Sequence, residues 1–166
     1  MKVKFIVVAM LALFVSGSAR PANQLDSYLS RLQGAWNGEG TAFGGKATVQ
    51  QKWEWVLGDK FFRLSLKYEI KRADGKTQAF EGHGYYKAKG EGKYEGQWFD
   101  LDGHQYPINA TIEGDALVAL WGIPGKVEGR STYRLIESGN QLEATDAIKQ
   151  KDGAWREFSR FNLRRE

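Results

Sequence analysis

The hydrophobic and polar positions of this chain follow two different periods, and the change between them occurs at Gly34. After Gly34, apolar and polar residues alternate with a period of two, which is typical of strands with one buried face. Before it, between Pro21 and Gln33, apolar residues recur at intervals of three and four, which predicts a short helix with one apolar stripe. The stripe consists of Leu25, Tyr28, Leu29 and Leu32.

Turn signals divide the alternating region at intervals of about 8 to 12 residues, the spacing of strands in a barrel or sandwich. Each signal combines glycine with aspartate or asparagine, residues that tolerate positive φ and let a strand return directly along its neighbour. The signals are Gly58-Asp59, Asp74-Gly75, Asp102-Gly103, Gly114-Asp115, Gly139-Asn140 and Asp152-Gly153. Direct returns favour an antiparallel meander.

The segments between these turns predict ten strands, with boundaries accurate to about 2 to 4 residues. They cover residues 36–43, 46–57, 60–72, 76–88, 93–101, 104–113, 116–121, 129–137, 141–150 and 154–164. A twisted sheet of this many strands tends to close, because closure removes the exposed edges that would recruit another chain. We therefore expect an all-β fold, an antiparallel meander barrel of about ten strands, with one short N-terminal helix that caps one end.

The alternation also indicates which side chains point into this barrel. Apolar residues share one parity in the rows Val49 to Leu57, Phe62 to Ile70, Phe80 to Ala88, Tyr106 to Ile112 and Leu142 to Ile148. Polar residues fall on or near the same parity, namely Tyr68, Tyr86, Tyr106, Tyr133, Asp146 and Ser159. Apolar walls with a few convergent polar groups are typical of a ligand pocket.

The aromatic residues of these rows are the candidates for ligand contacts, because their rings offer apolar area and their hydroxyl or N–H groups can orient a polar end. The candidate residues are Trp53, Trp55, Tyr68, Tyr86, Tyr106 and Tyr133. The alternative interpretation places these tyrosines at the barrel mouths with hydrated hydroxyls and leaves the lumen packed.

The first nineteen residues have the three parts of a secretory signal. Lys2 and Lys4 precede an apolar run from Phe5 to Val15, and the small residues 16–19 follow it. The run is shorter than the roughly 20 apolar residues that span a bilayer. We expect residues 1–19 to be a signal peptide and residues 20–166 to form a single barrel domain that is periplasmic or secreted. The sequence contains no cysteine, which excludes disulfides and a lipidated cysteine.

The charge balance gives no argument for nucleic acid as a partner. Removal of Lys2 and Lys4 takes the formal net charge from +4 to +2. The basic residues near the C-terminus are spaced along a strand, as on a solvated face. They are Arg156, Arg160, Arg164 and Arg165. We expect a monomer whose partner is a small apolar or amphipathic molecule, with no membrane-spanning segment in the mature chain.

The glycine-rich segment Gly34-Ala35-Trp36-Asn37-Gly38-Glu39-Gly40 resembles the first strand of the calycin superfamily, most closely its nitrobindin-like and fatty-acid-binding-protein-like branch of ten-stranded barrels. Residues 94–100 and 152–165 resemble parts of exported lipocalin-like domains. The resemblance implies that Trp36 closes one end of the barrel against a basic residue of the last strand. Arg160, Arg164 and Arg165 are the candidates for that residue.

Nitrobindin-like proteins bind haem through a histidine late in the chain, and no histidine follows His104 in this sequence. We therefore expect no haem and no other cofactor. His83 has the parity of an outward-facing side chain, and His104 falls at a barrel rim.

Catalysis would need an acid and a base within hydrogen-bond reach, and His104 with Asp100 or Asp102 is the one candidate group. An aspartate-rich turn more often fixes a hairpin. The same aspartates match the start of a calcium loop, but the late glutamate of that pattern is missing. We expect no catalytic residues and no metal site.

The sequence thus favours an exported barrel that holds a largely apolar molecule in its lumen. One alternative is an enzyme that uses the same cavity on a lipid-like or aromatic substrate. Another is a packed barrel that contacts an envelope partner through exposed aromatic residues such as Tyr85 or Phe158.

Overall fold

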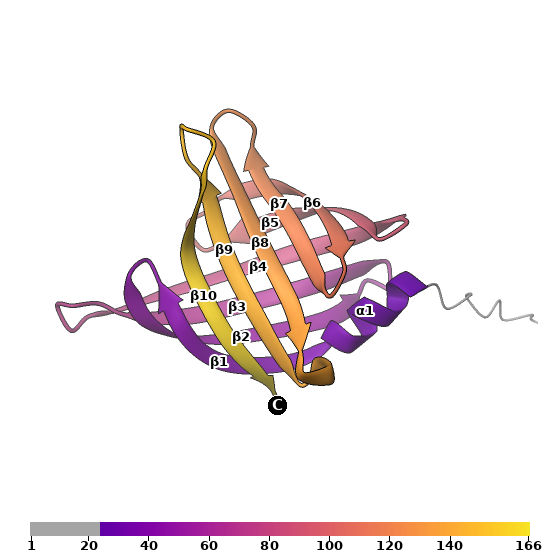
Figure 1. The fold of residues 1–166 in the computed structure, drawn as a ribbon, viewed down its shortest axis with the longest axis horizontal. Helices are drawn as coiled ribbons and strands as arrows, with labels where there is room; N and C mark the ends of the chain where they lie inside the picture. Colours follow the sequence, from indigo (N-terminus) through magenta and orange to yellow (C-terminus); the bar gives the residue numbers. More distant parts are fainter. Residues whose placement is uncertain (1–23) are drawn as a thin grey trace, which may run out of the picture.

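Ten antiparallel strands form a closed barrel with one short helix in the computed structural model, which describes residues 24–166 and side chains from residue 28 onward (Figure 1). The expected signal peptide, residues 1–19, lies outside the described residues, so export stays a prediction. Within the described residues, no helix has both the length and the apolar character needed to cross a membrane.

The helix and strands alternate with short turns in the order expected from the sequence. They are α1 (Gln24–Leu32), β1 (Gly34–Ala42), β2 (Gly45–Val56), β3 (Phe61–Lys71), β4 (Thr77–Gly90), β5 (Lys93–Asp100), β6 (Gln105–Glu113), β7 (Ala116–Ile123), β8 (Val127–Ile136), a 3-10 turn η1 (Glu137–Gly139), β9 (Gln141–Lys149) and β10 (Trp155–Arg165). No strand boundary differs from its expected position by more than two residues.

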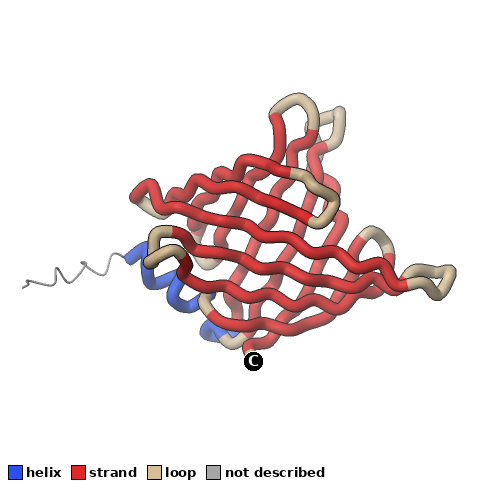
Figure 2. The backbone as a smooth tube through the Cα atoms, turned by 180° about the vertical axis from the view of Figure 1, so that it is seen from behind, coloured by secondary structure: helices blue, strands red, loops and turns tan. Residues whose placement is uncertain are grey.

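Each strand pairs with its neighbours in sequence, and β1 pairs with β10 to close the barrel. The hairpin loops lie at the two ends of the strands, and the wall between them is continuous (Figure 2). The predicted all-β meander barrel is confirmed, because every pairing between consecutive strands is antiparallel.

The glycines of β1 allow the close approach of β1 and β10 at the seam where the barrel closes. A Cβ atom at Gly40 would lie 1.9 Å from the carbonyl oxygen of Arg160, and one at Gly38 would lie 2.1 Å from that of Asn162. No side chain larger than hydrogen fits at these distances. The glycine-rich pattern of the first strand is therefore a requirement of closure.

Trp36 and Arg165 close the end of the barrel next to α1. The Trp36 ring is fully buried, and the Arg165 guanidinium carbon lies 4.2 Å from the ring centroid. Trp36 Nε1 donates a hydrogen bond to the Leu32 carbonyl (2.8 Å), and Arg165 donates to that of Gln33 (2.5 Å). The expected contact between Trp36 and a basic residue of the last strand is confirmed, with Arg165 as that residue.

Helix α1 covers the same end of the barrel. Leu29 and Leu32 are almost completely buried, and the Tyr28 hydroxyl donates a hydrogen bond to the Tyr133 carbonyl oxygen on β8 (2.6 Å). Burial raises the pKa of Tyr28 to about 12, so this hydroxyl stays neutral. The helix thus makes one end of the barrel solid, and any lumen must open at the other end.

Two positions differ from the strict alternation. Leu57 does not continue the inward row of β2 but lies exposed in the β2–β3 turn, because its φ of 53° is that of a reversing chain. Phe158 is not an exposed aromatic residue. A bulge between Glu157 and Ser159 turns it toward the barrel mouth, where its ring stacks on Phe43 with a centroid distance of 4.8 Å.

Candidate ligand-binding cavity

The barrel contains a cavity of about 260 Å³ that opens at the end opposite α1. Its rim is formed by turns between strands, with Phe43 from the β1–β2 turn, Asp102 and His104 from the β5–β6 turn, and Val127 at the start of β8. Deeper residues come from the inward rows of β3 to β9. The lumen of this barrel is therefore partly open rather than packed throughout.

Aromatic rings line two sides of the cavity. On β3 to β5, Tyr68 stacks on Phe80 with centroids 4.8 Å apart, and Phe80 lies parallel to Trp98 at 6.3 Å. On the side of β6 and β7, His104 stacks on Tyr106 at 5.6 Å, and Tyr106 contacts Trp121 at 5.7 Å. The two sides give the lumen broad apolar faces with few polar atoms.

Inward-facing glycines make room for the two tryptophans of these walls. A Cβ atom at Gly82 would lie 2.2 Å from the indole of Trp98, and one at Gly129 would lie 2.1 Å from that of Trp121. Each indole therefore lies against glycine backbone on a neighbouring strand instead of filling the lumen. The cavity remains open because each of these tryptophans lies over a glycine of the neighbouring strand.

The structure places four of the six candidate residues on the cavity wall, namely Tyr68, Tyr86, Tyr106 and Tyr133. Trp53 lies fully buried beneath them, with its ring 4.8 Å from that of Tyr133. Trp55 packs against Phe62 near the β2–β3 turn at 5.0 Å. Neither tryptophan lines the cavity. Each packs against other aromatic rings of the barrel interior instead. The binding role of all six stays a prediction.

A carboxyl group with two serine partners projects into the lumen. Asp146 on β9 accepts hydrogen bonds from Ser131 Oγ on β8 and Ser159 Oγ on β10, each at 2.5 Å. Trp121 Nε1 in turn donates to Ser131 Oγ at 3.0 Å. Burial raises the pKa of Asp146, and the two serine hydroxyls oppose part of that increase.

The tyrosine hydroxyls of the lumen remain neutral. Burial raises the pKa values of Tyr68, Tyr86 and Tyr133 well above the usual range. For Tyr68, the negative charge of Asp146 and of the two aspartates at the mouth adds to the increase. The lumen therefore offers neutral phenol groups and carboxyl groups to a ligand.

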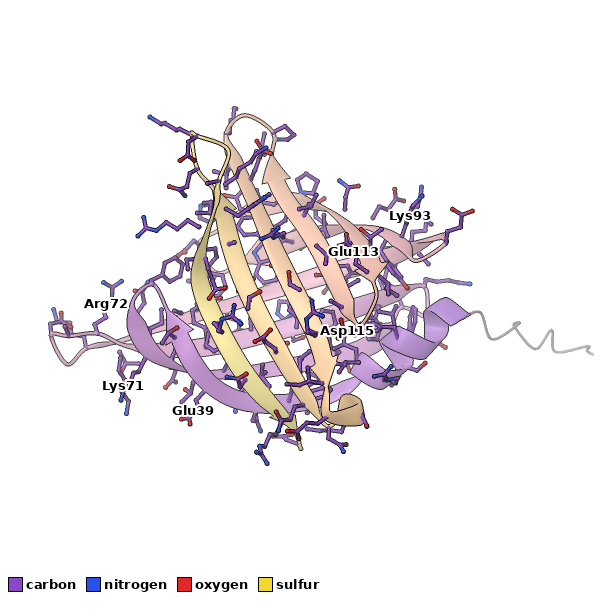
Figure 3. The ribbon with its side chains drawn as sticks, in the orientation of Figure 1. Glu39, Lys71, Arg72, Lys93, Glu113 and Asp115 are labelled. Carbon is purple, nitrogen blue, oxygen red and sulfur yellow. The ribbon has the colours of Figure 1, made fainter. Side chains whose placement is uncertain are left out.

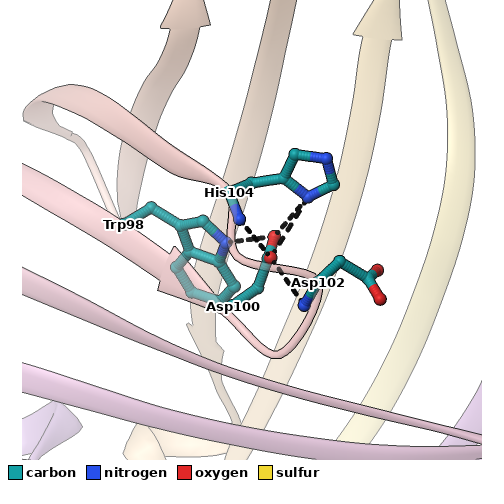
Figure 4. A network of polar contacts seen from close by, with 4 residues as sticks. All are labelled: Trp98, Asp100, Asp102 and His104. Atoms are coloured by element: carbon teal, nitrogen blue, oxygen red, sulfur yellow. Dashed lines mark hydrogen bonds and ion pairs between the residues drawn. The ribbon is translucent and has the colours of Figure 1, made fainter.

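Asp100 organises the β5–β6 turn at the cavity mouth (Figure 4). Its carboxylate accepts hydrogen bonds from the backbone N–H groups of Asp102 (3.1 Å) and His104 (3.0 Å). It also accepts from Trp98 Nε1 at 3.3 Å and contacts His104 Nδ1 at 3.1 Å. Asp100, Asp102 and His104 bring possible ligand atoms within 4.8 Å of one another. These contacts use both carboxylate oxygens of Asp100. The close approach of Asp100, Asp102 and His104 is therefore accounted for by the hydrogen bonds that hold the β5–β6 turn.

The sequence analysis placed Asp146 among the inward polar groups of the expected pocket but not among the candidate ligand contacts. It assigned no ligand-binding role to Trp98, Trp121 or Ser131. A usable signal was present for the tryptophans, because both have inward parity and each neighbours an inward glycine on the adjacent strand. For Asp146, its parity indicates an inward carboxyl group. The two serines that hold it come from strands on either side and are recognised only through the register.

Asp146→Asn should make the ligand-free barrel more stable at neutral pH. Since the pKa of Asp146 is raised, the folded protein retains this proton to a higher pH than the unfolded chain, whose aspartate pKa is about 3.9. The stability that the protonated group provides is complete below the unfolded pKa and is lost as the pH rises through the folded pKa.

Urea unfolding of both proteins across that pH range tests this expectation. The midpoint of the Asn variant should exceed that of the wild type at neutral pH, and the difference should shrink toward acid pH. A variant that is less stable than the wild type at every pH would show that the Asp146 carboxylate is not penalised by burial.

Solved structures of two other proteins share this architecture. Rv2717c from M. tuberculosis is 18% identical with a TM-score of 0.62, and the match covers 87% of this chain and 98% of that one. The S-type phycobiliprotein lyase CPES from Guillardia theta is 11% identical with a TM-score of 0.58, covering 87% and 94%. No protein-family model and no curated protein sequence matches the chain. These similarities establish a lipocalin-like barrel fold and leave the function to be argued from the site.

Proposed function

We propose that this protein is an exported carrier that holds a small, largely apolar molecule in the barrel lumen and performs no covalent chemistry on it. The cavity of about 260 Å³ with aromatic walls is the observation that carries the proposal. It exceeds the engineered cavity of about 150 Å³ that binds benzene. It lies just below the range of about 300–1,000 Å³ that is usual for ligand pockets. A body of one or two rings fits this size.

The location follows from the N-terminal sequence. The basic residues, apolar run and small residues of positions 1–19 support cleavage and export to the periplasm or the exterior. The closed barrel supports a monomer, because the ten described strands leave no unpaired sheet edge for a second copy.

The nitrobindin-like and fatty-acid-binding-protein-like branch is the calycin branch that we favour for this chain. Ten strands in a meander, a helix at the closed end and the Trp36–Arg165 contact support that assignment. The chain departs from nitrobindin-like proteins in having no histidine after His104, and His104 lies at the mouth. The proposal therefore excludes haem held by a late histidine.

The contacts that Asp100 and His104 make at the cavity mouth favour a carrier over an enzyme. A phycobiliprotein lyase is among the proteins of similar fold, so the fold alone is compatible with enzymes. In this chain, the Asp100 carboxylate is held by its own turn, and His104 stacks on Tyr106. These contacts support structural roles for both residues.

Tyr106→Ala should weaken binding of an apolar probe by about tenfold, because it removes a lining ring that contacts Trp121. A fluorescence titration with N-phenylnaphthylamine measures the change. Tyr85→Ala is the matched control, since Tyr85 packs on Phe99 on the outer face of the barrel. We expect wild-type affinity for that variant. Equal affinities of the two variants would contradict a site in the lumen.

A further inference from the structure

The lumen carries negative charge, although the chain as a whole has a formal net charge of +4. Three carboxyl groups, those of Asp100, Asp102 and Asp146, line the cavity together with one histidine. Among the described residues, no lysine or arginine lines it. Charged side chains such as Glu39, Lys71 and Lys93 instead point away from the barrel (Figure 3).

Asp146 lacks a cationic partner in the described part of the chain. Its two oxygens accept one serine hydroxyl each at 2.5 Å. A carboxylate has about four acceptor positions. Each oxygen therefore keeps capacity for a further donor, and the carboxyl group borders the cavity.

The basic residues near Asp146 in the sheet are engaged on the outer face. Arg160 on β10 binds Glu143 and Glu157, and the Arg130 guanidinium lies 4.9 Å from the centroid of the Trp155 ring. Both have the parity opposite to that of the lumen. A positive charge beside Asp146 must therefore come from outside the barrel strands.

The rings around this carboxyl group suit a cation as well as an apolar body. Trp121 is joined to Asp146 through the Ser131 hydroxyl, and Tyr106 lies against Trp121. Aromatic faces attract organic cations through the ring quadrupole. A protonated amine would therefore bind the Asp146 carboxylate, and its apolar body would lie among the rings that line the same cavity.

We propose that the molecule held in the lumen is a small organic cation, a protonated amine on an apolar body of one or two rings, whose ammonium group binds Asp146. This inference rests on the proposed carrier function and specifies the chemical class of its ligand. Fatty-acid-like anions are disfavoured, because they would bring a carboxylate into a cavity that already contains three carboxyl groups and no lysine or arginine.

Three probes with the same ring system and different charge test the inference by calorimetric titration near neutral pH. They are naphthylmethylamine, which is protonated, naphthylmethanol, which is neutral, and naphthoate, which is anionic. The amine should bind about tenfold more tightly than the alcohol, since hydrogen bonds to charged groups are the stronger class. Naphthoate should bind most weakly.

Two aspartate variants locate the charge that is recognised. Asp146→Asn should lower the affinity for the amine by about tenfold and leave the alcohol within about twofold. Asp59→Asn is the matched control, because it removes the same formal charge from the exposed β2–β3 turn at the closed end, outside the cavity lining. Asparagine tolerates the positive φ of this position, and we expect wild-type affinities for all three probes. Thermal unfolding checks that both variants fold, and the comparison of the three probes on the wild type needs neither variant.

The outcomes separate this inference from the carrier proposal. Equal affinity for the three probes, or tightest binding of naphthoate, would overturn the cationic ligand and leave binding in the lumen intact. An amine preference that survives Asp146→Asn would overturn the role of Asp146. Failure of all three probes to bind would overturn the carrier function and this inference together.

Discussion

Trp36→Ala should lower the free energy of unfolding by about 3–5 kcal/mol, the usual cost of removing a large buried aromatic side chain. The Trp36 ring is fully buried beneath α1, and the Arg165 guanidinium covers it at 4.2 Å. Its loss also removes the hydrogen bond to the Leu32 carbonyl, so the helix should loosen from the barrel. Chemical denaturation followed by far-UV circular dichroism measures the change.

Trp155→Ala provides the comparison for this experiment. Trp155 on β10 is half-buried, and the Arg130 guanidinium carbon lies 4.9 Å from the centroid of the Trp155 ring. Trp155 and Trp36 each lie under an arginine guanidinium, but Trp36 is fully buried and Trp155 is not. We expect a loss of about 1 kcal/mol or less, as for cation–π contacts at exposed sites. Similar losses for the two variants would contradict the role of Trp36 in closing the barrel.

Gly129→Ala should reduce binding of N-phenylnaphthylamine by tenfold or more, because overpacking costs about 1–3 kcal/mol and the displaced group must enter the lumen. A Cβ at this position would lie 2.1 Å from the Trp121 indole. The indole would have to turn into the cavity and give up its hydrogen bond to Ser131. Fluorescence titration measures the affinity, and thermal unfolding shows whether the barrel remains folded.

A second substitution distinguishes a filled cavity from a damaged fold. Adding Trp121→Phe to Gly129→Ala removes the outer indole atoms that the new methyl group would meet. We expect this double variant to recover most of the lost affinity. If Gly129→Ala binds the probe as tightly as the wild type, the space over Gly129 does not determine the shape of the cavity.

The fold could be predicted from the sequence because the turn residues and the alternation between them are local signals. Each turn contains residues that permit positive φ, and Gly75, Gly103, Gly114 and Gly153 adopt it. The alternation between turns gave the inward rows, and Phe62, Leu64 and Tyr68 are buried as their parity indicates. The one-residue bulge at Phe158 was not apparent, because nothing in the residues around it distinguishes a bulge from a regular strand.

The site was only partly predictable, because parity separates inside from outside and does not give depth along the barrel. Trp53 and Tyr106 both face inward, yet Trp53 pairs with Gly34 near the closed end and Tyr106 pairs with Trp98 on the cavity wall. Depth depends on the stagger of all ten strands around the closed sheet. The space for Trp98 and Trp121 likewise depends on which glycine lies opposite each indole.

Native mass spectrometry of the mature protein purified from its own compartment, followed by denaturing extraction and small-molecule analysis, tests the carrier function most directly. We expect a stoichiometric small molecule, lost on unfolding, with a one- or two-ring body and a protonated amine. A barrel that is consistently recovered without a bound molecule, and that also fails to bind N-phenylnaphthylamine, would contradict a function based on its lumen.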